Sequence, residues 1–199
     1  MIEVMTKSRE RLLARARRDG LETVGYRVVD SPVGPLWIAV GPKGVLGIHY
    51  GAEPSHVELA RIVRRYGPGV LPDPRRADVV ARQLDQYFEG KRRAFDVPVD
   101  LSTLTDFQQR ILGATARVGY GDVATYATVA ARAGIPKAFR AAGAALGSNP
   151  VPIVVPCHRV LASDGSLGGY GGGLEAKRRL LQLERGSVPA GGWVRADQR

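Results

Sequence analysis

A change of pattern near residue 100 limits the possible folds of this chain more than any other feature of its sequence. Before it, three short β-prone runs lie at 26–29, 36–40 and 45–50, separated by turns rich in glycine and proline. Such runs are typical of antiparallel strands joined in a meander. After it, apolar residues recur mainly at helical spacing. The sequence therefore predicts an α+β fold, with a small antiparallel sheet and helices first and a mostly helical part second.

Two helices are expected to follow the strands, over 55–66 and 77–89. The second has an apolar face at helical spacing, made by Val80, Leu84, Tyr87 and Phe88. Gly90 is expected to end it, because glycine favours the position after a helix. The run 95–99 is a candidate for one more strand, and 100–104 is expected to link the two halves.

The second half opens with a predicted helix-turn-helix unit. Thr105 and Gln108 have the spacing of a capping box, so a helix is expected to begin there. Its apolar stripe comprises Phe107, Ile111, Ala114 and Val118. Further helices are expected over 125–133 and 137–146, and the latter consists almost entirely of small residues, with Arg140 as the long exception. Small side chains allow either tight helix packing or a close approach to DNA.

The formal net charge is +10, and an excess of this size creates a field that attracts polyanions. It fits either nucleic-acid binding or solubility alone. No apolar run reaches the roughly 18 residues that a membrane-spanning helix needs, and the start lacks a secretory pattern. The sequence therefore predicts an intracellular protein outside the membrane, with nucleic acid as the first candidate partner.

Cys157 is the only cysteine, which excludes an internal disulfide, and three histidines beside it cannot complete a cysteine-rich zinc site. It is either a small buried apolar residue or a reactive thiol. The preceding run, 151–156, is apolar and is expected to be stiff and extended. A nearby histidine or cation would lower the thiol pKa toward neutrality. Neighbours in an extended chain point to opposite faces, so His158 is expected to act through a turn or a bridging water.

The final predicted helix, 174–184, carries an acid on its apolar side. Leu174, Leu180 and Leu181 form that side, and Glu184 follows on it near the helix C-terminus. A buried carboxylate there needs a partner, because burial and the helix dipole both disfavour its charge. Either His158 is that partner, in a Cys–His–Glu relay, or Glu184 turns outward at a frayed helix end.

The segment 165–173 is too rich in glycine to be an ordinary core loop. It either wraps closely around a flat ligand, with Tyr170 as the stacking surface, or is a flexible connection. It lacks the phosphate-loop pattern, and no βαβ unit frames it as a dinucleotide site.

Several motifs around Cys157 occur together in one known family. The run 155–160 is VPCHRV, the run 147–150 before it is GSNP, and the run 169–174 after it is GYGGGL. In this order they resemble the O6-alkylguanine-DNA alkyltransferases, also called methylated-DNA-protein-cysteine methyltransferases. The likeness extends from about residue 87 to residue 184 and is weaker over 26–50.

The resemblance implies direct-reversal DNA repair by a single-turnover methyltransferase. Cys157 would displace guanine O6 from the alkyl carbon and keep the alkyl group as a thioether. His158 would be the water-mediated base, with Glu184 behind it. Asn149 would hold the active-site turn, and Tyr126 would donate a proton to the leaving guanine. The resemblance implies no cofactor and no metal.

The implied partner is double-stranded DNA carrying O6-alkylguanine, bound through the minor groove without sequence specificity and with the damaged nucleotide flipped out. Arg140 would fill the gap left by that nucleotide. The other DNA-contacting residues would be Thr125, Lys137, Ala138, Ala141 and Gly143. The base pocket would be lined by Pro152, Val160, Tyr170 and Gly172.

The implied architecture has four parts. A basic extension at 1–20 precedes a ribonuclease-H-like α/β domain at 21–100. A catalytic domain with a winged helix-turn-helix-like DNA-binding unit follows at 101–186, before a tail at 187–199. A cytoplasmic monomer is expected. Three rival functions fit parts of the sequence: a lesion-binding relative that does not repair, a transcription regulator and a cysteine hydrolase.

Overall fold

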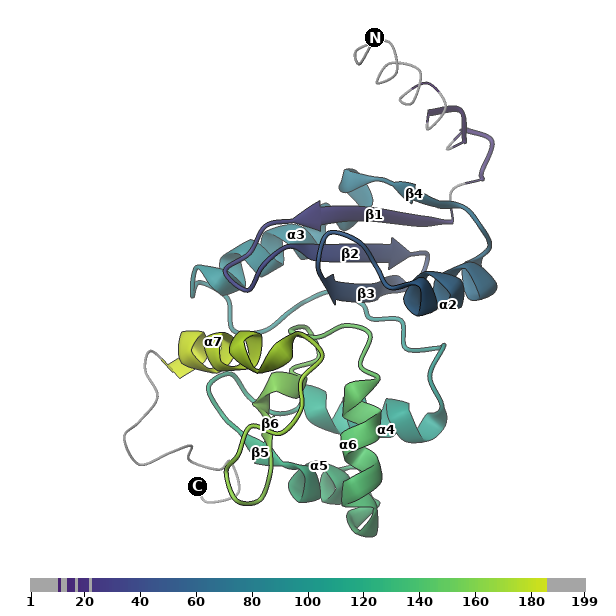
Figure 1. The fold of residues 1–199 in the computed structure, drawn as a ribbon. Helices are drawn as coiled ribbons and strands as arrows, with labels where there is room; N and C mark the ends of the chain where they lie inside the picture. Colours follow the sequence, from purple (N-terminus) through teal and green to yellow (C-terminus); the bar gives the residue numbers. More distant parts are fainter. Residues whose placement is uncertain (1–10, 12–13, 17, 22, 186–199) are drawn as a thin grey trace.

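The computed structural model describes residues 11, 14–16, 18–21 and 23–185. Most of the expected extension at 1–20, and all of the expected tail at 187–199, lie outside the described residues. Figure 1 shows two parts, the sheet with its flanking helices above and a cluster of helices below, joined by a single crossing of the chain. Within the described part, no helix is long and apolar enough to cross a membrane.

The first half contains a four-stranded sheet in the order β3–β2–β1–β4. Its strands are β1 (Val24–Val29), β2 (Leu36–Gly41), β3 (Gly44–Tyr50) and β4 (Val70–Pro72). The first three form the predicted antiparallel meander. The fourth was not predicted and pairs parallel to β1, so the sheet is mixed rather than purely antiparallel. Its proline is tolerated because β4 lies at the edge.

Two helices belong to this half, α2 (His56–Tyr66) and α3 (Pro74–Phe88). The second begins three residues before its predicted start, because Asp73 caps it and Pro74 occupies its first turn. Of its predicted apolar face, Val80, Leu84 and Tyr87 are buried, while Phe88 is half-buried, and the helix packs against β1 and β2. The run 95–99 is not the expected strand, since only Val99 forms an isolated bridge, to β3.

The second half is mostly helical, as predicted. It comprises α4 (Asp106–Ala116), β5 (Ala124–Thr125), α5 (Tyr126–Arg132), η1 (Pro136–Ala138), α6 (Phe139–Gly147), η2 (Cys157–Arg159), β6 (Val160–Leu161) and α7 (Gly173–Arg185). Both bonds of the predicted capping box, between Thr105 and Gln108, are present. The third predicted helix is divided into a 3₁₀ turn, η1, and α6. β5 and β6 pair in parallel beside the helices.

One hydrophobic core runs through both halves, with Leu36 and Tyr87 from the first and Ile111 and Leu180 from the second in the same cluster. Helix α7 lies along the face of the second half that meets the sheet (Figure 1), and Arg179 Nη1 donates to the Pro32 carbonyl at 2.8 Å. The junction of the halves is therefore packed. Leu174, predicted on the apolar side of α7, is instead 44% exposed, because it lies at the helix start.

Candidate active site

A tight turn, and not the predicted extended chain, leads into Cys157. Val155 N donates to Val151 O at 2.9 Å, and Ile153 has a φ of 75°, which β-branched residues rarely adopt. Asn149 braces the turn, because its Nδ2 donates to Val155 O at 2.8 Å and its Oδ1 accepts from Val151 N at 3.1 Å. The turn thus delivers Cys157 at the start of η2.

The Cys157 thiol is half-buried, and Asn149 Nδ2 donates to its Sγ at 3.1 Å. Burial raises the pKa of the thiol, and the bond from Asn149 and the charge of Lys177 only partly offset this effect. From the sequence we noted that a nearby histidine or cation would lower this pKa. In the structure Lys177 is such a cation, but burial outweighs its effect, so the thiol of the free protein is protonated at neutral pH.

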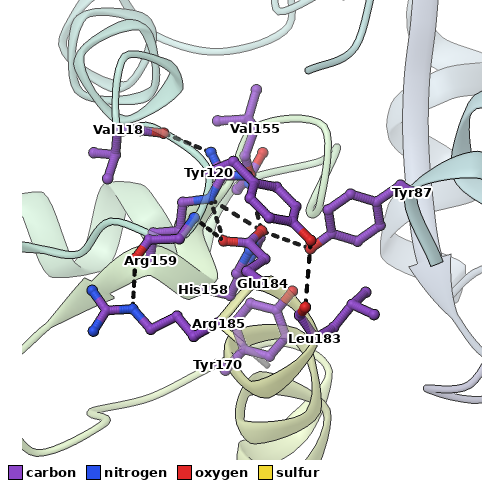
Figure 2. A network of polar contacts seen from close by, with 12 residues as sticks. Tyr87, Val118, Tyr120, Val155, His158, Arg159, Tyr170, Leu183, Glu184 and Arg185 are labelled. Atoms are coloured by element: carbon purple, nitrogen blue, oxygen red, sulfur yellow. Dashed lines mark hydrogen bonds and ion pairs between the residues drawn. The ribbon is translucent and has the colours of Figure 1, made fainter. Parts of the chain in front are cut away.

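His158 and Arg159 do not point to opposite faces, because η2 is helical where an extended chain was expected. Both side chains reach Glu184 (Figure 2). His158 Nε2 lies 2.8 Å from Glu184 Oε1, while Arg159 donates from Nε to Oε2 and from Nη2 to Oε1, each at 2.9 Å. The guanidinium thus holds the carboxylate with two parallel bonds, the strongest geometry for this pair.

Glu184 is fully buried, and its two oxygens have further donors. Tyr87 Oη donates to Oε1 at 2.7 Å, and Gly121 N donates to Oε2 at 3.1 Å. Burial alone would raise the pKa of Glu184, but His158 and Arg159 outweigh it and lower this pKa to about 2. The group is therefore a carboxylate at neutral pH, with its charge balanced by Arg159. The alternative of an outward-turned Glu184 is wrong.

Burial lowers the pKa of His158 and outweighs the opposing effect of Glu184, so the imidazole is neutral at neutral pH. A carboxylate only accepts, so His158 carries its proton on Nε2 and presents a lone pair on Nδ1. Within the described part of the chain, Nδ1 is buried and has no hydrogen-bond partner. The residue after Cys157 is therefore a base held in one tautomer, with its accepting atom unused.

Three residues of this site were not predicted from the sequence: Tyr87, Arg159 and Lys177. Lys177 is fully buried, and its Nζ donates to Val160 O at 2.7 Å and also to Leu167 O. Burial lowers the pKa of Lys177 to about 8. One signal for it was available, because Lys177 precedes Glu184 by seven residues and so shares its face of α7.

Two cavities meet at Cys157. The first has a volume of about 370 Å³ and is lined by Tyr126, Gly143, Leu146, Gly147, Cys157, Gly169, Tyr170 and Gly171. The Tyr126 ring packs between α6 and the glycine-rich loop, where a Cβ on Gly168 would lie only 2.7 Å from Tyr126 Oη. The glycines therefore allow this loop to approach the ring, which leaves a slot suited to a flat ligand.

The second cavity has a volume of about 420 Å³ and extends from Cys157 to β3 and α2. Of the predicted pocket residues, Tyr170 lines both cavities and Pro152 lines only the second. Val160 is buried and Gly172 packs against the Tyr50 ring, where a Cβ would approach to 2.5 Å. Neither of these two lines either cavity, because Val160 belongs to the core and Gly172 lies against Tyr50.

The residues predicted to contact DNA lie mostly on one short stretch, η1 and α6. Lys137, Arg140 and Ala141 are exposed there, and the Arg140 guanidinium lies 5.5 Å from the Phe139 ring centre. Thr125 differs, because it is buried and its Oγ1 accepts from Thr128 N at 3.1 Å as the cap of α5. Among the described residues, no group of three or more His, Cys, Asp or Glu side chains could hold a metal ion.

Two family models match the chain, one for each half. The model described as "6-O-methylguanine DNA methyltransferase, ribonuclease-like domain" matches residues 24–101. The model described as "6-O-methylguanine DNA methyltransferase, DNA binding domain" matches residues 106–186. Together they span the sheet, the turn that carries Cys157 and the helix that carries Glu184.

Individual relatives match over almost their whole length. The methylated-DNA–protein-cysteine methyltransferase of Mycobacterium bovis is 42% identical over 170 residues, covering 84% of this chain and 96% of that protein. The enzyme of the same name from Methanosarcina barkeri is 35% identical over 163 residues, covering 82% and 98%. A crystal structure of Mycobacterium tuberculosis OGT in complex with DNA superposes with a TM-score of 0.71 at 40% identity, covering 83% and 96%. This chain therefore belongs to the 6-O-methylguanine DNA methyltransferase family.

Proposed function

We propose that this protein repairs O6-alkylguanine in DNA by transferring the alkyl group, once and irreversibly, to Cys157. One observation carries the proposal: the only cysteine lies at the edge of a slot walled by Tyr126, Tyr170 and glycines, directly before a histidine held as a neutral base. The names of the relatives support this reaction, and the Mycobacterium tuberculosis structure supports DNA as the partner.

The thiol must first lose its proton, because burial raises its pKa. The unused Nδ1 of His158 accepts that proton through a bridging water, while Glu184 stabilises the ring as it becomes charged. The nearby charge of Lys177 favours the thiolate. Only the thiolate is an effective nucleophile, so this transfer activates Cys157 at the moment of reaction.

The transfer itself is a direct displacement. The bond between Cys157 Sγ and the alkyl carbon forms while the bond from that carbon to guanine O6 breaks, and the electron pair stays with guanine. Tyr126, which lines the same slot, donates a proton to the leaving base. The products are unmodified guanine and a thioether, which has no good leaving group. One protein molecule therefore repairs one lesion, without a cofactor.

A base inside a duplex hides its O6 from the thiol, so the nucleotide must flip out at a cost of a few kcal/mol. Arg140, exposed on α6 among small side chains, offsets part of that cost by occupying the gap from the minor groove. Lys137, Ala138, Ala141 and Gly143 lie beside it, while Thr125 fixes the start of α5. These contacts read no base sequence, as repair throughout a genome requires.

We also propose that the protein acts as a monomer in the cytoplasm. A single chain supplies every group of the relay, from Cys157 to Glu184. A free reactive thiol is typical of compartments in which disulfide formation is suppressed, such as the cytoplasm.

Mass spectrometry of the intact protein tests the transfer. After incubation with a duplex containing O6-methylguanine, we expect one added methyl group, located on Cys157, and none with an undamaged duplex. Tight binding without a mass change would favour a lesion-binding protein. Repair over many cycles would instead indicate a hydrolytic enzyme, and a preference for one undamaged sequence would indicate a regulator.

The role of Arg140 is tested with two substrates. In Arg140→Ala, repair of a duplex should slow by about tenfold or more, because flipping loses about 1.4 kcal/mol of support. Transfer from the free alkylguanine base, which needs no flipping, should keep its rate. Arg82→Ala, a change of the same kind at another exposed arginine, on α3, is the matched control. Equal losses on both substrates would contradict the assignment.

A further inference from the structure

Strand β3 is bonded to the second half of the molecule along its outer side. It is the first strand in the order β3–β2–β1–β4, so its outer backbone groups have no strand beside them. On that side, Ile48 N donates to Pro150 O at 2.8 Å. Pro150 follows Asn149, which braces the turn that carries Cys157. The sheet is therefore attached directly to the segment that presents the thiol.

The last residue of β3, Tyr50, makes a second connection through its side chain. Its hydroxyl shares a hydrogen bond of 2.6 Å with the hydroxyl of Tyr170, and the two rings meet edge to face with centres 5.7 Å apart. Gly172 permits this contact, because a Cβ there would lie only 2.5 Å from the Tyr50 ring. A side chain of the sheet thus reaches the glycine-rich loop, 165–173.

The two hydroxyls of this pair depend on each other. Burial raises the pKa of Tyr50 and of Tyr170, so both groups keep their protons at neutral pH. Among the described residues, each hydroxyl has the other as its hydrogen-bond partner. A buried hydroxyl that loses its partner is destabilising, whereas removal of both partners can be nearly neutral. Loss of the Tyr50 hydroxyl alone would therefore drive the Tyr170 ring to turn toward a new partner.

Tyr170 lies against two parts of the reaction site. Its ring lines the slot for the base together with Cys157 and Tyr126. It also lies edge-on to the His158 ring, as Figure 2 shows, with centres 6.5 Å apart. A turn of the Tyr170 ring would change both the shape of the slot and the packing of the imidazole. Displacement requires close alignment of the reacting atoms, and a misplacement of about 1 Å can slow a reaction about 100-fold.

We propose that Tyr50 is a positioning residue for the alkyl transfer, because its hydroxyl holds the Tyr170 ring as a fixed wall of the base slot. Tyr50 acts through Tyr170 and needs no contact with the base. This inference rests on the proposed function, and it gives the sheet domain a part in the speed of the transfer. The residues proposed to contact DNA lie mainly on η1 and α6, so the affinity for a duplex should not depend on Tyr50.

Single-turnover kinetics separate this role from a purely structural one. With a duplex containing O6-methylguanine in excess, the final amount of bound methyl counts the folded protein, while the rate constant describes each folded molecule. The dependence on duplex concentration then gives a maximal rate constant and a half-saturating concentration. In Tyr50→Phe, we expect the maximal rate constant to fall by about tenfold or more. The half-saturating concentration should stay within about twofold of the wild-type value.

Tyr66→Phe is the matched control. Tyr66 belongs to the same half of the molecule, its hydroxyl donates to Asp100, and it lines neither cavity at Cys157. The substitution therefore removes a tyrosine hydroxyl bond away from the reaction site. It should affect only the amount of folded protein and leave the maximal rate constant within about twofold.

A double variant makes the test specific to the pair. Tyr50→Phe combined with Tyr170→Phe leaves neither hydroxyl without its partner, so it should react faster than Tyr50→Phe alone. An unchanged maximal rate constant in Tyr50→Phe would overturn the proposal, as would an equal fall in Tyr66→Phe or a double variant no faster than Tyr50→Phe. Failure of the wild-type protein to accept methyl on Cys157 would instead refute the proposed function.

Discussion

The two sides of His158 are built in different ways. Behind it, the fully buried Glu184 receives hydrogen bonds from four residues, and Arg159 balances its charge. In front of it, Cys157 and Tyr170 line two open cavities and have one side-chain hydrogen bond each. The contrast teaches that the protein holds the His158 ring rigidly from behind and leaves the side that carries Cys157 open to a substrate.

The largest expected effect is a loss of alkyl transfer at Cys157 without a matching loss of stability. Cys157→Ser should reduce alkyl transfer by about 10⁶-fold, the loss typical of removing a nucleophile. Its free energy of unfolding should change by less than about 1 kcal/mol, because the side chain keeps its size and few contacts change. Mass spectrometry and urea unfolding measure the two quantities. A serine variant that still clears methyl lesions would refute the role of the thiol.

The rear side should respond in the opposite way, by losing stability. Glu184→Gln leaves the charge of Arg159 buried without a counter-charge, so the free energy of unfolding should fall by about 3–5 kcal/mol. Glu175→Gln is the control on the same helix, since Glu175 forms only exposed ion pairs, with Arg178 and Arg179. Its change should stay below about 1 kcal/mol. Equal losses of unfolding free energy in Glu184→Gln and Glu175→Gln would show that the buried contacts of Glu184 stabilise the fold no more than exposed ion pairs do.

Low pH should destabilise the folded protein by protonating Glu184. The folded pKa of Glu184, about 2, lies below the ordinary value of 4.5, so its stabilising effect is complete above pH 4.5 and is lost as pH falls toward 2. At about 1.4 kcal/mol for each pKa unit, the loss amounts to about 3 kcal/mol. Unfolding followed across this range should show the loss in Glu175→Gln and not in Glu184→Gln. A parallel decline in both variants would contradict the assignment.

The smallest effects give the sharpest comparison, because two tyrosine hydroxyls can be removed by the same substitution. Tyr87→Phe removes a bond to a buried carboxylate and should cost about 1.5–3 kcal/mol of stability. Tyr170→Phe removes a bond between two neutral hydroxyls and should cost about 0.5–1.5 kcal/mol. Thermal and urea unfolding decide the order. If Tyr170→Phe were the more costly change, the front side would be as rigid as the rear.

Local signals in the sequence predicted much of this molecule. The capping box at Thr105 begins α4, and the apolar spacing of Val80, Leu84 and Tyr87 gave the buried face of α3. Strand β4 was missed, since three residues are too few to show alternation and its pairing with β1 depends on the chain between them. Short-range patterns therefore predicted the helices and the meander.

The candidate site was only half accessible from the sequence. The pairing of His158 with Glu184 could be expected from a buried acid in need of a partner. The hydroxyl of Tyr87 could not, because it reaches Glu184 across 97 residues of sequence. The contact of Arg159 with Glu184 was missed because an extended chain was assumed around Cys157. The structure has a left-handed residue, Ile153, and a 3₁₀ turn there instead.

The protonated state of the Cys157 thiol affects how long an unreacted protein molecule stays able to repair DNA. Because one molecule would repair one lesion, a reaction of Cys157 with peroxide or another electrophile before repair would inactivate the protein. Such agents attack the thiolate, and burial keeps Cys157 in the thiol form. In the proposed mechanism the thiol becomes reactive only when its proton passes to His158, so an unreacted protein molecule stays able to repair DNA for longer.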